Sequence, residues 1–361
     1  MSTELHTPSS SLLAAAPDAG PATPERVLAL ADQAAAIADR KLSAIHKVAL
    51  QTRILALTAT ITAAKAGDAG RSFSAVANEV KALAVEVARI SEEMERELQT
   101  AFGELRAVGE RMAAEVRGVR LVDLALNAIE IIDRNLYERT CDVRWWATDS
   151  AVVQAALHPD PAILAHASQR LGIILGAYTV YLDIWICDAQ GRVLTHGRPA
   201  RYPKVAGHSV TGEKWFREAL ASTSGDHFSV SDINRCDPLA NAAVATYAAS
   251  IRENGDPQGR TLGVIGIHFD WTPQSDAVVR GIRLTADEKT RTRALLLDAQ
   301  GRVLAASDGQ GVLSEVIHLE AGNRTSGCTT DAHGRLIAFH RTPGYETYRG
   351  LGWYGALIQT P

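Results

Sequence analysis

The sequence contains no cysteine pair of the kind that binds zinc. Its four cysteines, Cys141, Cys187, Cys236 and Cys328, stand far apart and never form a CxxC pair. This spacing indicates neither a zinc module nor a disulfide framework. Isolated cysteines of this kind are typical of small buried side chains in a reducing compartment. We therefore expect a cytoplasmic protein without a metal centre.

Long hydrophobic runs are also lacking, and a membrane span needs about 20 mostly apolar residues. The most apolar stretches, residues 171–185 and 243–251, are too short or are interrupted by polar groups. Residues 1–23 are rich in Ser, Pro and Ala but lack the basic region and apolar core of a signal peptide. We interpret them as a disordered lead-in.

The chain has no excess of positive charge, because its formal net charge is -4 over 361 residues. A chain of this balance offers no basic field to hold nucleic acid. Walker loops, dinucleotide-binding fingerprints, HExxH motifs and nucleophile elbows are absent as well. We therefore expect no nucleic-acid partner, no cofactor and no enzymatic activity.

Proline is missing between Pro24 and Pro159, in a region rich in Ala, Glu, Leu, Lys and Arg that favours helix. Two glycines, Gly67 and Gly70, interrupt this region and permit a tight reversal near residues 66–71. The pattern predicts an antiparallel helical hairpin over residues 24–118. Its second arm carries apolar residues at steps of three and four, which predict a coiled-coil seam. These residues are Val76, Val80, Leu83, Val87, Ile90, Met94, Leu98, Phe102, Leu105, Val108 and Met112.

An internal repeat marks the rest of the chain. The heptapeptide Asp188–Leu194 (DAQGRVL) recurs unchanged at Asp298–Leu304, and a weaker copy stands at Asp331–Leu336. Asp-x-x-Gly between apolar runs is a hairpin signature, in which Asp closes the turn and Gly takes the positive φ. Hairpins of one kind about 110 residues apart indicate a duplicated module.

Residues 45–84 resemble, without a gap, the signalling tip of methyl-accepting chemotaxis proteins. The resemblance runs from Ile45-His46-Lys47 through the bend Ala66-Gly67-Asp68-Ala69-Gly70-Arg71 to Leu83-Ala84. It implies a hairpin that dimerises into a four-helix bundle and binds the chemotaxis histidine kinase and its coupling protein. The kinase-coupling positions that it implies are Gln51, Leu55, Leu57, Lys65, Asp68, Arg71, Phe73 and Val76.

Several polar positions depart from that family pattern. Arg53 and Thr58 stand where the family usually has Asn, Thr62 where it has Glu, and Lys65 where it has Arg. Lysine cannot form the two-pronged hydrogen bonds of arginine. These departures favour an alternative, a small-molecule-binding or scaffolding protein that uses the hairpin only to dimerise.

From about residue 133 to 361 the chain resembles a double Cache sensor domain. The resemblance is carried by Gly212–Leu220 (GEKWFREAL), Val230-Ser231-Asp232 and Gly263–Asp270 (GVIGIHFD). It implies an α+β fold in which two PAS-like antiparallel-sheet modules hang from one long helix. We place the sensor at residues 119–361, with a first module at about 160–275 and a second at about 285–361.

In this family the small-molecule pocket lies in the first module, beside the helix that carries Trp215. The amino-acid-binding branch has an arginine where this chain has Glu213 and an aspartate where it has His268. A carboxylate would repel the ligand's carboxylate, so an amino acid is disfavoured and a cationic or neutral polar ligand is favoured. The pocket candidates are Tyr181, Trp185, His208, Trp215, Phe216, Ser231, Asp232, Asn234, Tyr247 and His268.

Other interpretations of these residues stay open. Trp185, Trp215 and Phe216 can equally be plain core, and His268 a satisfied core histidine. Cys236, His208 and His268 lack metal-ligand spacing but could meet around a metal or haem. The predicted function is a chemosensory transducer, in which ligand closure shifts the long helix at residues 119–158 and so alters the hairpin.

Overall fold

The computed structural model describes residues 23–361, so the predicted lead-in lies outside the described residues except for Thr23. The chain divides into two compact units, with the boundary between Arg117 and Gly118. Within residues 23–361 we find no helix that combines the length and the apolar character needed to cross a bilayer.

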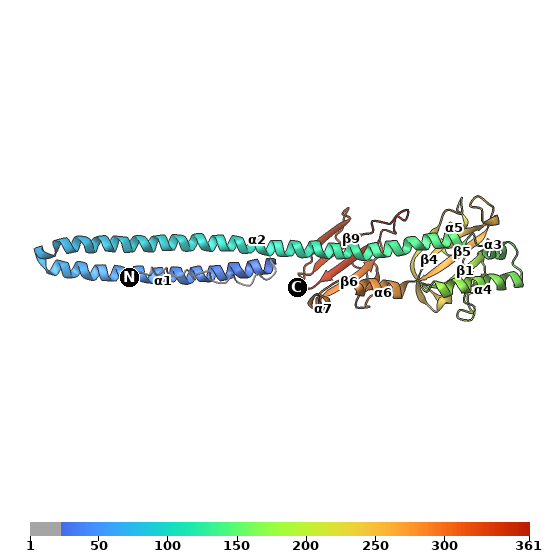
Figure 1. Cartoon of the computed structure of the whole chain (residues 1–361), viewed down its shortest axis with the longest axis horizontal. Helices are drawn as coiled ribbons and strands as arrows, with labels where there is room; N and C mark the ends of the chain where they lie inside the picture. Colours follow the sequence, from blue (N-terminus) through green and yellow to red (C-terminus); the bar gives the residue numbers. More distant parts are fainter. Residues whose placement is uncertain (1–22) are drawn as a thin grey trace, which may run out of the picture. The chain divides into compact units, whose positions relative to one another are not determined.

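The first unit is the predicted antiparallel helical hairpin (Figure 1). It consists of α1 (Pro24–Lys65), the short 3₁₀ helix η1 (Gly67–Gly70) and the first part of α2 (Arg71–Trp146). The Thr23 hydroxyl caps α1 by accepting a hydrogen bond from the backbone N–H of Arg26 at 3.3 Å. Gly67 has φ +58°, so the reversal uses glycine's access to the left-handed region.

Small side chains, and not large ones, form the contact between the two arms. In α1 the buried positions recur at every seventh residue as Leu42, Ala49, Ala56 and Ala63, and in α2 as Ala77, Ala84 and Ser91. Alanines at this spacing let two helix backbones approach closely. The predicted seam was therefore wrong for the contact within one chain. Its large members lie outside that contact, for example Leu83 at 62% exposure and Met112 at 54%.

The second unit contains two antiparallel sheets of five strands each, as the duplicated module predicted. Their strand orders, β2-β1-β5-β4-β3 and β7-β6-β10-β9-β8, repeat one topology. The first sheet consists of β1 (Tyr181–Asp188), β2 (Val193–His196), β3 (Ser229–Cys236), β4 (Ala242–Arg252) and β5 (Thr261–Asp270). The second consists of β6 (Thr292–Leu297), β7 (Val303–Ala306), β8 (Ser326–Thr330), β9 (Leu336–Arg341) and β10 (Tyr354–Gln359). This is the predicted double Cache fold.

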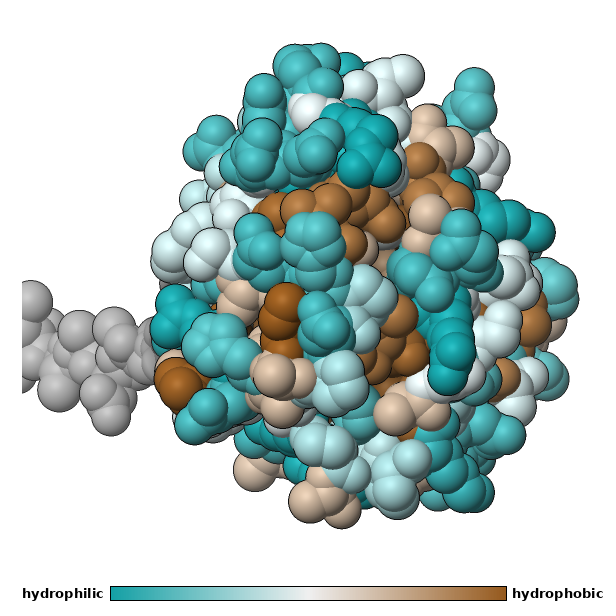
Figure 2. Space-filling view, turned by 90° about the vertical axis from the view of Figure 1, so that its right-hand side faces the viewer, coloured by the Kyte–Doolittle hydropathy of each residue, from teal (hydrophilic) through white to brown (hydrophobic). Residues whose placement is uncertain are grey.

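Five further helices of the second unit lie between the strands in sequence or precede them. They are α3 (Ser150–Leu157), α4 (Pro161–Ala177), α5 (Lys214–Leu220), α6 (Trp271–Gly281) and α7 (Ala286–Arg291). Two 3₁₀ turns, η2 (Asp237–Leu239) and η3 (Glu253–Gly255), complete the unit. The end of this unit that faces the viewer in Figure 2 is largely hydrophilic, with hydrophobic side chains visible in its recesses.

Each copy of the repeat forms the predicted hairpin turn. The glycines Gly191, Gly301 and Gly334 have φ between +76° and +86°. In each copy the aspartate carboxylate accepts backbone N–H bonds from the residues two and four positions later, at 2.8–2.9 Å. Local chemistry therefore sets these turns, independently of the rest of the fold.

The second part of α2 packs against the sheets of the second unit. Its residues Leu121, Ile129, Ile132 and Leu136 are fully buried in the main hydrophobic core, which includes side chains from both sheets. The helix ends at Trp146, so the expected continuous helix to residue 158 was wrong. The Asp149 carboxylate instead caps α3 by accepting the Ala151 N–H at 2.9 Å.

Candidate functional site

A pocket of about 230 Å³ lies on one face of the first sheet. Strands β1, β3 and β4 and the start of α5 supply its walls. Six of the ten candidate residues line it together. They are Trp185, His208, Trp215, Ser231, Asp232 and Asn234. The structure thus brings six of the predicted residues to one cavity, and ligand binding there stays a prediction.

Strand register explains why these side chains share one face. Ser231 pairs with Thr246, Thr246 with His268, and His268 with Asp183, which forms a row across β3, β4, β5 and β1. Residues directly opposite each other in antiparallel strands point to the same face of the sheet. The polar groups beneath the pocket therefore come from four different strands.

His268 lies beneath the pocket between two indole rings. Its ring centroid is 3.9 Å from that of Trp185 and 5.9 Å from that of Trp215. Its Nδ1 lies 3.0 Å from the hydroxyl of Thr246, which itself lines the pocket. Burial, with a smaller contribution from nearby His208, lowers the pKa of His268 to about 3. The imidazole is therefore neutral at neutral pH, and its buried Nε2 has no hydrogen-bond partner among residues 23–361.

The Trp215 ring reaches the sheet because Gly266 has no side chain. A Cβ on Gly266 would lie only 3.0 Å from the Trp215 ring. Trp215 and Trp185 are both almost fully buried, at 3% and 2% exposure. Each also packs in a satellite hydrophobic cluster, so core packing and pocket lining are compatible roles here.

Carboxylates outnumber cations in the pocket lining. Glu213, Asp232 and Asp237 line it, and the basic side chains beside them are Arg235 and His208. Arg235 is partly engaged elsewhere, because it donates to the carbonyl of Asn241 at 3.1 Å. Partial burial raises the pKa of Asp232, while the nearby Arg302 opposes this shift. An acidic lining over indole rings suits a cationic group.

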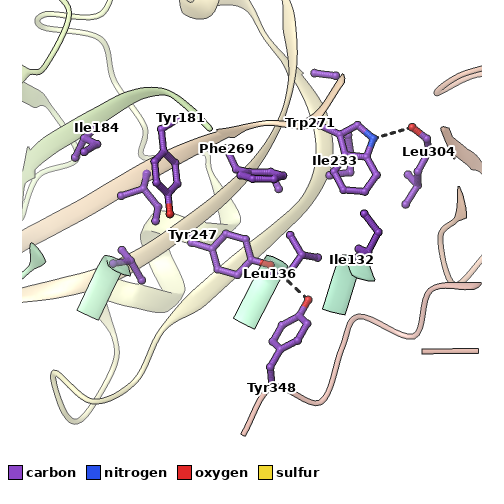
Figure 3. Close-up of a cluster of buried hydrophobic side chains, with 14 of the residues drawn as sticks. Ile132, Leu136, Tyr181, Ile184, Ile233, Tyr247, Phe269, Trp271, Leu304 and Tyr348 are labelled. Atoms are coloured by element: carbon purple, nitrogen blue, oxygen red, sulfur yellow. Dashed lines mark hydrogen bonds between the residues drawn. The ribbon is translucent and has the colours of Figure 1, made fainter. Parts of the chain in front are cut away.

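Four candidates do not line the pocket: His268, which lies beneath it, and Tyr181, Tyr247 and Phe216. Tyr181 and Tyr247 lie in the main hydrophobic core, where the Tyr181 hydroxyl donates to Asp142 at 2.5 Å and the Tyr247 hydroxyl to Tyr348 at 3.4 Å (Figure 3). Phe216 packs toward the β1–β2 turn, where a Cβ on Gly191 would lie 3.1 Å from its ring.

Sequence reasoning did not place several lining residues in the pocket. They are Val210, Arg235, Cys236, Asp237, Pro238, Val244 and Thr246. Arg235 and Cys236 end β3, Asp237 and Pro238 follow in the turn that leads into β4, and Val244 and Thr246 belong to β4 itself. The available signal was a strand with polar side chains that leads into a Cys-Asp-Pro turn. It was not sufficient, because the pairing register decides which side chains of the strand face the pocket, and that register depends on distant strands.

The alternative that a metal binds in this pocket is not supported by a cluster of ligands in the described part of the chain. Between residues 23 and 361 no three His, Cys, Asp or Glu side chains are grouped as metal ligands. Cys236 does line the pocket, and burial raises the pKa of its thiol to about 11. The thiolate that a metal requires is therefore disfavoured.

The eight predicted kinase-coupling residues are all exposed at the reversal end of the hairpin. The apolar members are the most conspicuous, since Leu55 is 70% exposed, Phe73 61% and Val76 59%. Asp68 and Arg71 form an exposed ion pair at 3.4 Å. The structure thus presents a surface with large apolar side chains that no other part of the described chain covers.

The threonines that depart from the family pattern direct their hydroxyls to their own helix. Thr58 donates to the carbonyl of Ile54 at 3.0 Å, and Thr62 to that of Thr58 at 2.9 Å. Bonds of this kind are common for threonine within helices. Neither hydroxyl proton is therefore available to a second molecule without breaking a local bond.

Comparison with known proteins finds relatives of the hairpin and of the part of α2 that follows it. Residues 23–143 match the family model described as the methyl-accepting chemotaxis protein (MCP) signalling domain. Methyl-accepting chemotaxis protein Amb0994 of Paramagnetospirillum magneticum is 57% identical over 53 residues, which are 15% of this chain and 12% of that protein. Protein PilJ of Pseudomonas aeruginosa is 39% identical over 116 residues, 31% of this chain and 17% of that protein. The chain thus spans less than a fifth of the length of these relatives.

Solved structures match the second unit in fold. The sensor domain of the Vibrio cholerae histidine kinase DctB aligns with TM-score 0.51 at 12% identity, over 70% of this chain and 99% of that domain. The sensory domain of the Campylobacter jejuni chemoreceptor Tlp3 aligns with TM-score 0.52 at 14% identity, over 68% of this chain and 94% of that domain. At these identities the likeness establishes the sensor-domain fold alone.

Proposed function

We propose that this chain, which joins an MCP signalling domain to a Cache-type sensor domain, binds a small cationic or neutral polar molecule and transmits its binding to a chemotaxis histidine kinase. The chain is chemoreceptor-like, and that family consists of receptors and not of enzymes. The pocket over His268 is the single observation that carries the ligand proposal. The exposed tip carries the kinase proposal.

The ligand class follows from charge and shape. Glu213, Asp232 and Asp237 give the pocket an acidic lining, while the neutral His268 lies beneath it and adds no positive charge. A cation here would be stabilised both by Coulomb attraction to a carboxylate and by a cation–π interaction with an indole face. An α-amino acid would bring its own carboxylate toward this lining and would be repelled, which agrees with the expectation from the sequence.

Titration calorimetry of the full chain with putrescine, choline and L-alanine tests this proposal. We expect the two amines to bind, L-alanine not to bind, and Glu213→Gln to weaken amine binding several-fold. Glu253→Gln is the matched control, because Glu253 belongs to the same module but pairs with Arg260 outside the pocket. Equal binding of L-alanine and the amines would refute the acidic pocket as the selective element.

Kinase coupling is supported by the exposed apolar tip and by the family. Members of this family act as homodimers, and the large side chains left outside the contact between the arms suit a second hairpin. A pull-down of an active chemotaxis kinase with its coupling protein tests the tip. We expect Phe73→Ala to reduce capture strongly and Met112→Ala, which is also exposed but lies far along the arm, to leave it unchanged.

The alternative is that the hairpin serves only for dimerisation. It is favoured by Thr58 and Thr62, whose hydroxyls bond to their own helix where the family offers free amide and carboxylate groups. Dimers in solution together with no capture of active kinase would establish this second function. The cytoplasmic location expected from the isolated cysteines stays a prediction, which cell fractionation would test.

The proposed route of the signal is α2, because its residues Arg71–Trp146 belong to both units. A two-state change in its packing would carry the signal. Insertion of two glycines after Val119 should uncouple the kinase response while leaving amine binding intact. A response of unchanged size in that variant would rule out the helix as the route.

A further inference from the structure

Strand β3 carries an irregularity where the pocket meets the second module. Ser231 pairs with Thr246 and Asn234 with Val244, so Asp232 and Ile233 together face the single residue Ala245. Two residues opposite one form a β-bulge, and bulges next to binding sites redirect side chains. The bulge therefore gives two neighbouring residues different surroundings.

The side chains of Asp232 and Ile233 lie in different surroundings on the two sides of the bulge. Asp232 lines the pocket with 37% of its side chain exposed. Ile233 is fully buried in the main core, where it lies near Trp271 and Leu304 in Figure 3. Trp271 in turn donates from Nε1 to the carbonyl of Leu304 in β7, at 2.7 Å. One strand thus supplies both features through neighbouring residues: Asp232 belongs to the pocket wall, and Ile233 contacts the second module.

The second module reaches this bulge through the repeated turn. Arg302 donates to the carbonyl of Ile233 at 3.2 Å, and its Nη2 lies 3.9 Å from Oδ2 of Asp232. A bond from its Nε to Asp298 at 2.8 Å holds the guanidinium in place. The equivalent Arg335 makes the same bond to Asp331, at 2.7 Å, but no hydrogen bond or ion pair to the first sheet in residues 23–361.

We propose that a cationic ligand in the first-module pocket competes with Arg302 for the Asp232 carboxylate, so that ligand binding loosens the contact between the two modules at the β3 bulge. The inference rests on the proposed pocket and its ligand class. Oδ1 of Asp232 is already bonded to the N–H of Ile233 at 2.7 Å, so the ligand and Arg302 share Oδ2. At 3.9 Å and partly exposed, the Arg302 pair is the weaker competitor.

Calorimetry and hydrogen exchange on the full chain test the competition, with putrescine and choline as probes. Arg302→Gln removes the competitor, and we expect it to bind the amines about two- to fivefold tighter than the unaltered chain. Arg335→Gln alters the same turn motif away from the bulge and should leave affinity unchanged. Unfolding temperatures of both variants check that the fold is retained.

The rate of amide hydrogen exchange measures directly how tightly the turn that carries Arg302 is held against the β3 bulge. In the unaltered chain, amine should speed exchange at residues 298–302. Arg302→Gln should show fast exchange there without ligand and no further response to amine. Asp232→Asn should likewise show fast exchange in the free protein. Amine binding with identical affinity and identical exchange in Arg302→Gln would overturn this inference and leave the pocket standing. No amine binding to the unaltered chain would refute the pocket proposal itself, and the competition with it.

Discussion

The backbone of α2 lies very close to the second sheet at Gly355 in β10. A Cβ placed on Gly355 would lie 2.1 Å from the carbonyl oxygen of Ala125, whereas ordinary contacts begin at 3.4 Å. The substitution Gly355→Ala would therefore force the helix backbone away by about 1.3 Å, because a main-chain carbonyl cannot rotate aside as a side chain does. Overpacking of this kind costs about 1–3 kcal/mol.

For a unit of this size, ~2 kcal/mol corresponds to a fall in unfolding temperature of roughly 4–8 °C. Intrinsic tryptophan fluorescence is a selective readout, since all six tryptophans of the chain belong to the second unit. Gly176→Ala is the matched control. Gly176 lies within α4 with nothing near its absent Cβ, so alanine there should stabilise by about 0.5–1 kcal/mol.

A lower unfolding temperature for Gly355→Ala and a higher one for Gly176→Ala would confirm that α2 and β10 meet at a position where only glycine fits. An unfolding temperature of Gly355→Ala equal to or above that of the unaltered chain would refute this close packing.

Three other outcomes follow from single contacts. Gly70→Ala should lower helix content on heating, measured by far-ultraviolet circular dichroism, more than Gly67→Ala. A Cβ on Gly70 would lie 2.1 Å from a backbone oxygen of α1, whereas alanine at position 67 meets no atom and adds only the backbone strain of φ +58°. The pKa of His268 is about 3 and that of an unfolded histidine about 6.5, so protons favour the unfolded chain between these values. Stability should fall as pH drops through that window, by at most about 1.4 kcal/mol per pH unit, and His268→Gln should flatten the fall in urea titrations. Hydrogen bonding from Arg120 lowers the pKa of Glu288 to about 2, so this pair stabilises the fold above about pH 4.3 and is lost as pH falls toward 2. Acid unfolding of Glu288→Gln should accordingly be less steep below pH 4.3 than that of the unaltered chain.

The hairpin and the repeated turns could be predicted because their causes are local. Absence of proline, two glycines at the reversal and Asp-x-x-Gly turns each act over a few residues. The pairing of the arms was not predicted correctly. The large apolar residues were the conspicuous pattern, but alanines such as Ala56 and Ala63 are the ones buried, since helices in close contact have room only for small side chains.

The sequence by itself determined the two parts of this protein, the hairpin with its reversal and the duplicated sheet modules. Tertiary structure decided which polar side chains meet. Thr246, His268 and Ser231 come from three strands and share a face only through the pairing register, while Tyr181 and Tyr247 point to the opposite core. The bulge that brings Asp232 within reach of Arg302 depends on the packing of Ile233 between the modules, which no local pattern encodes.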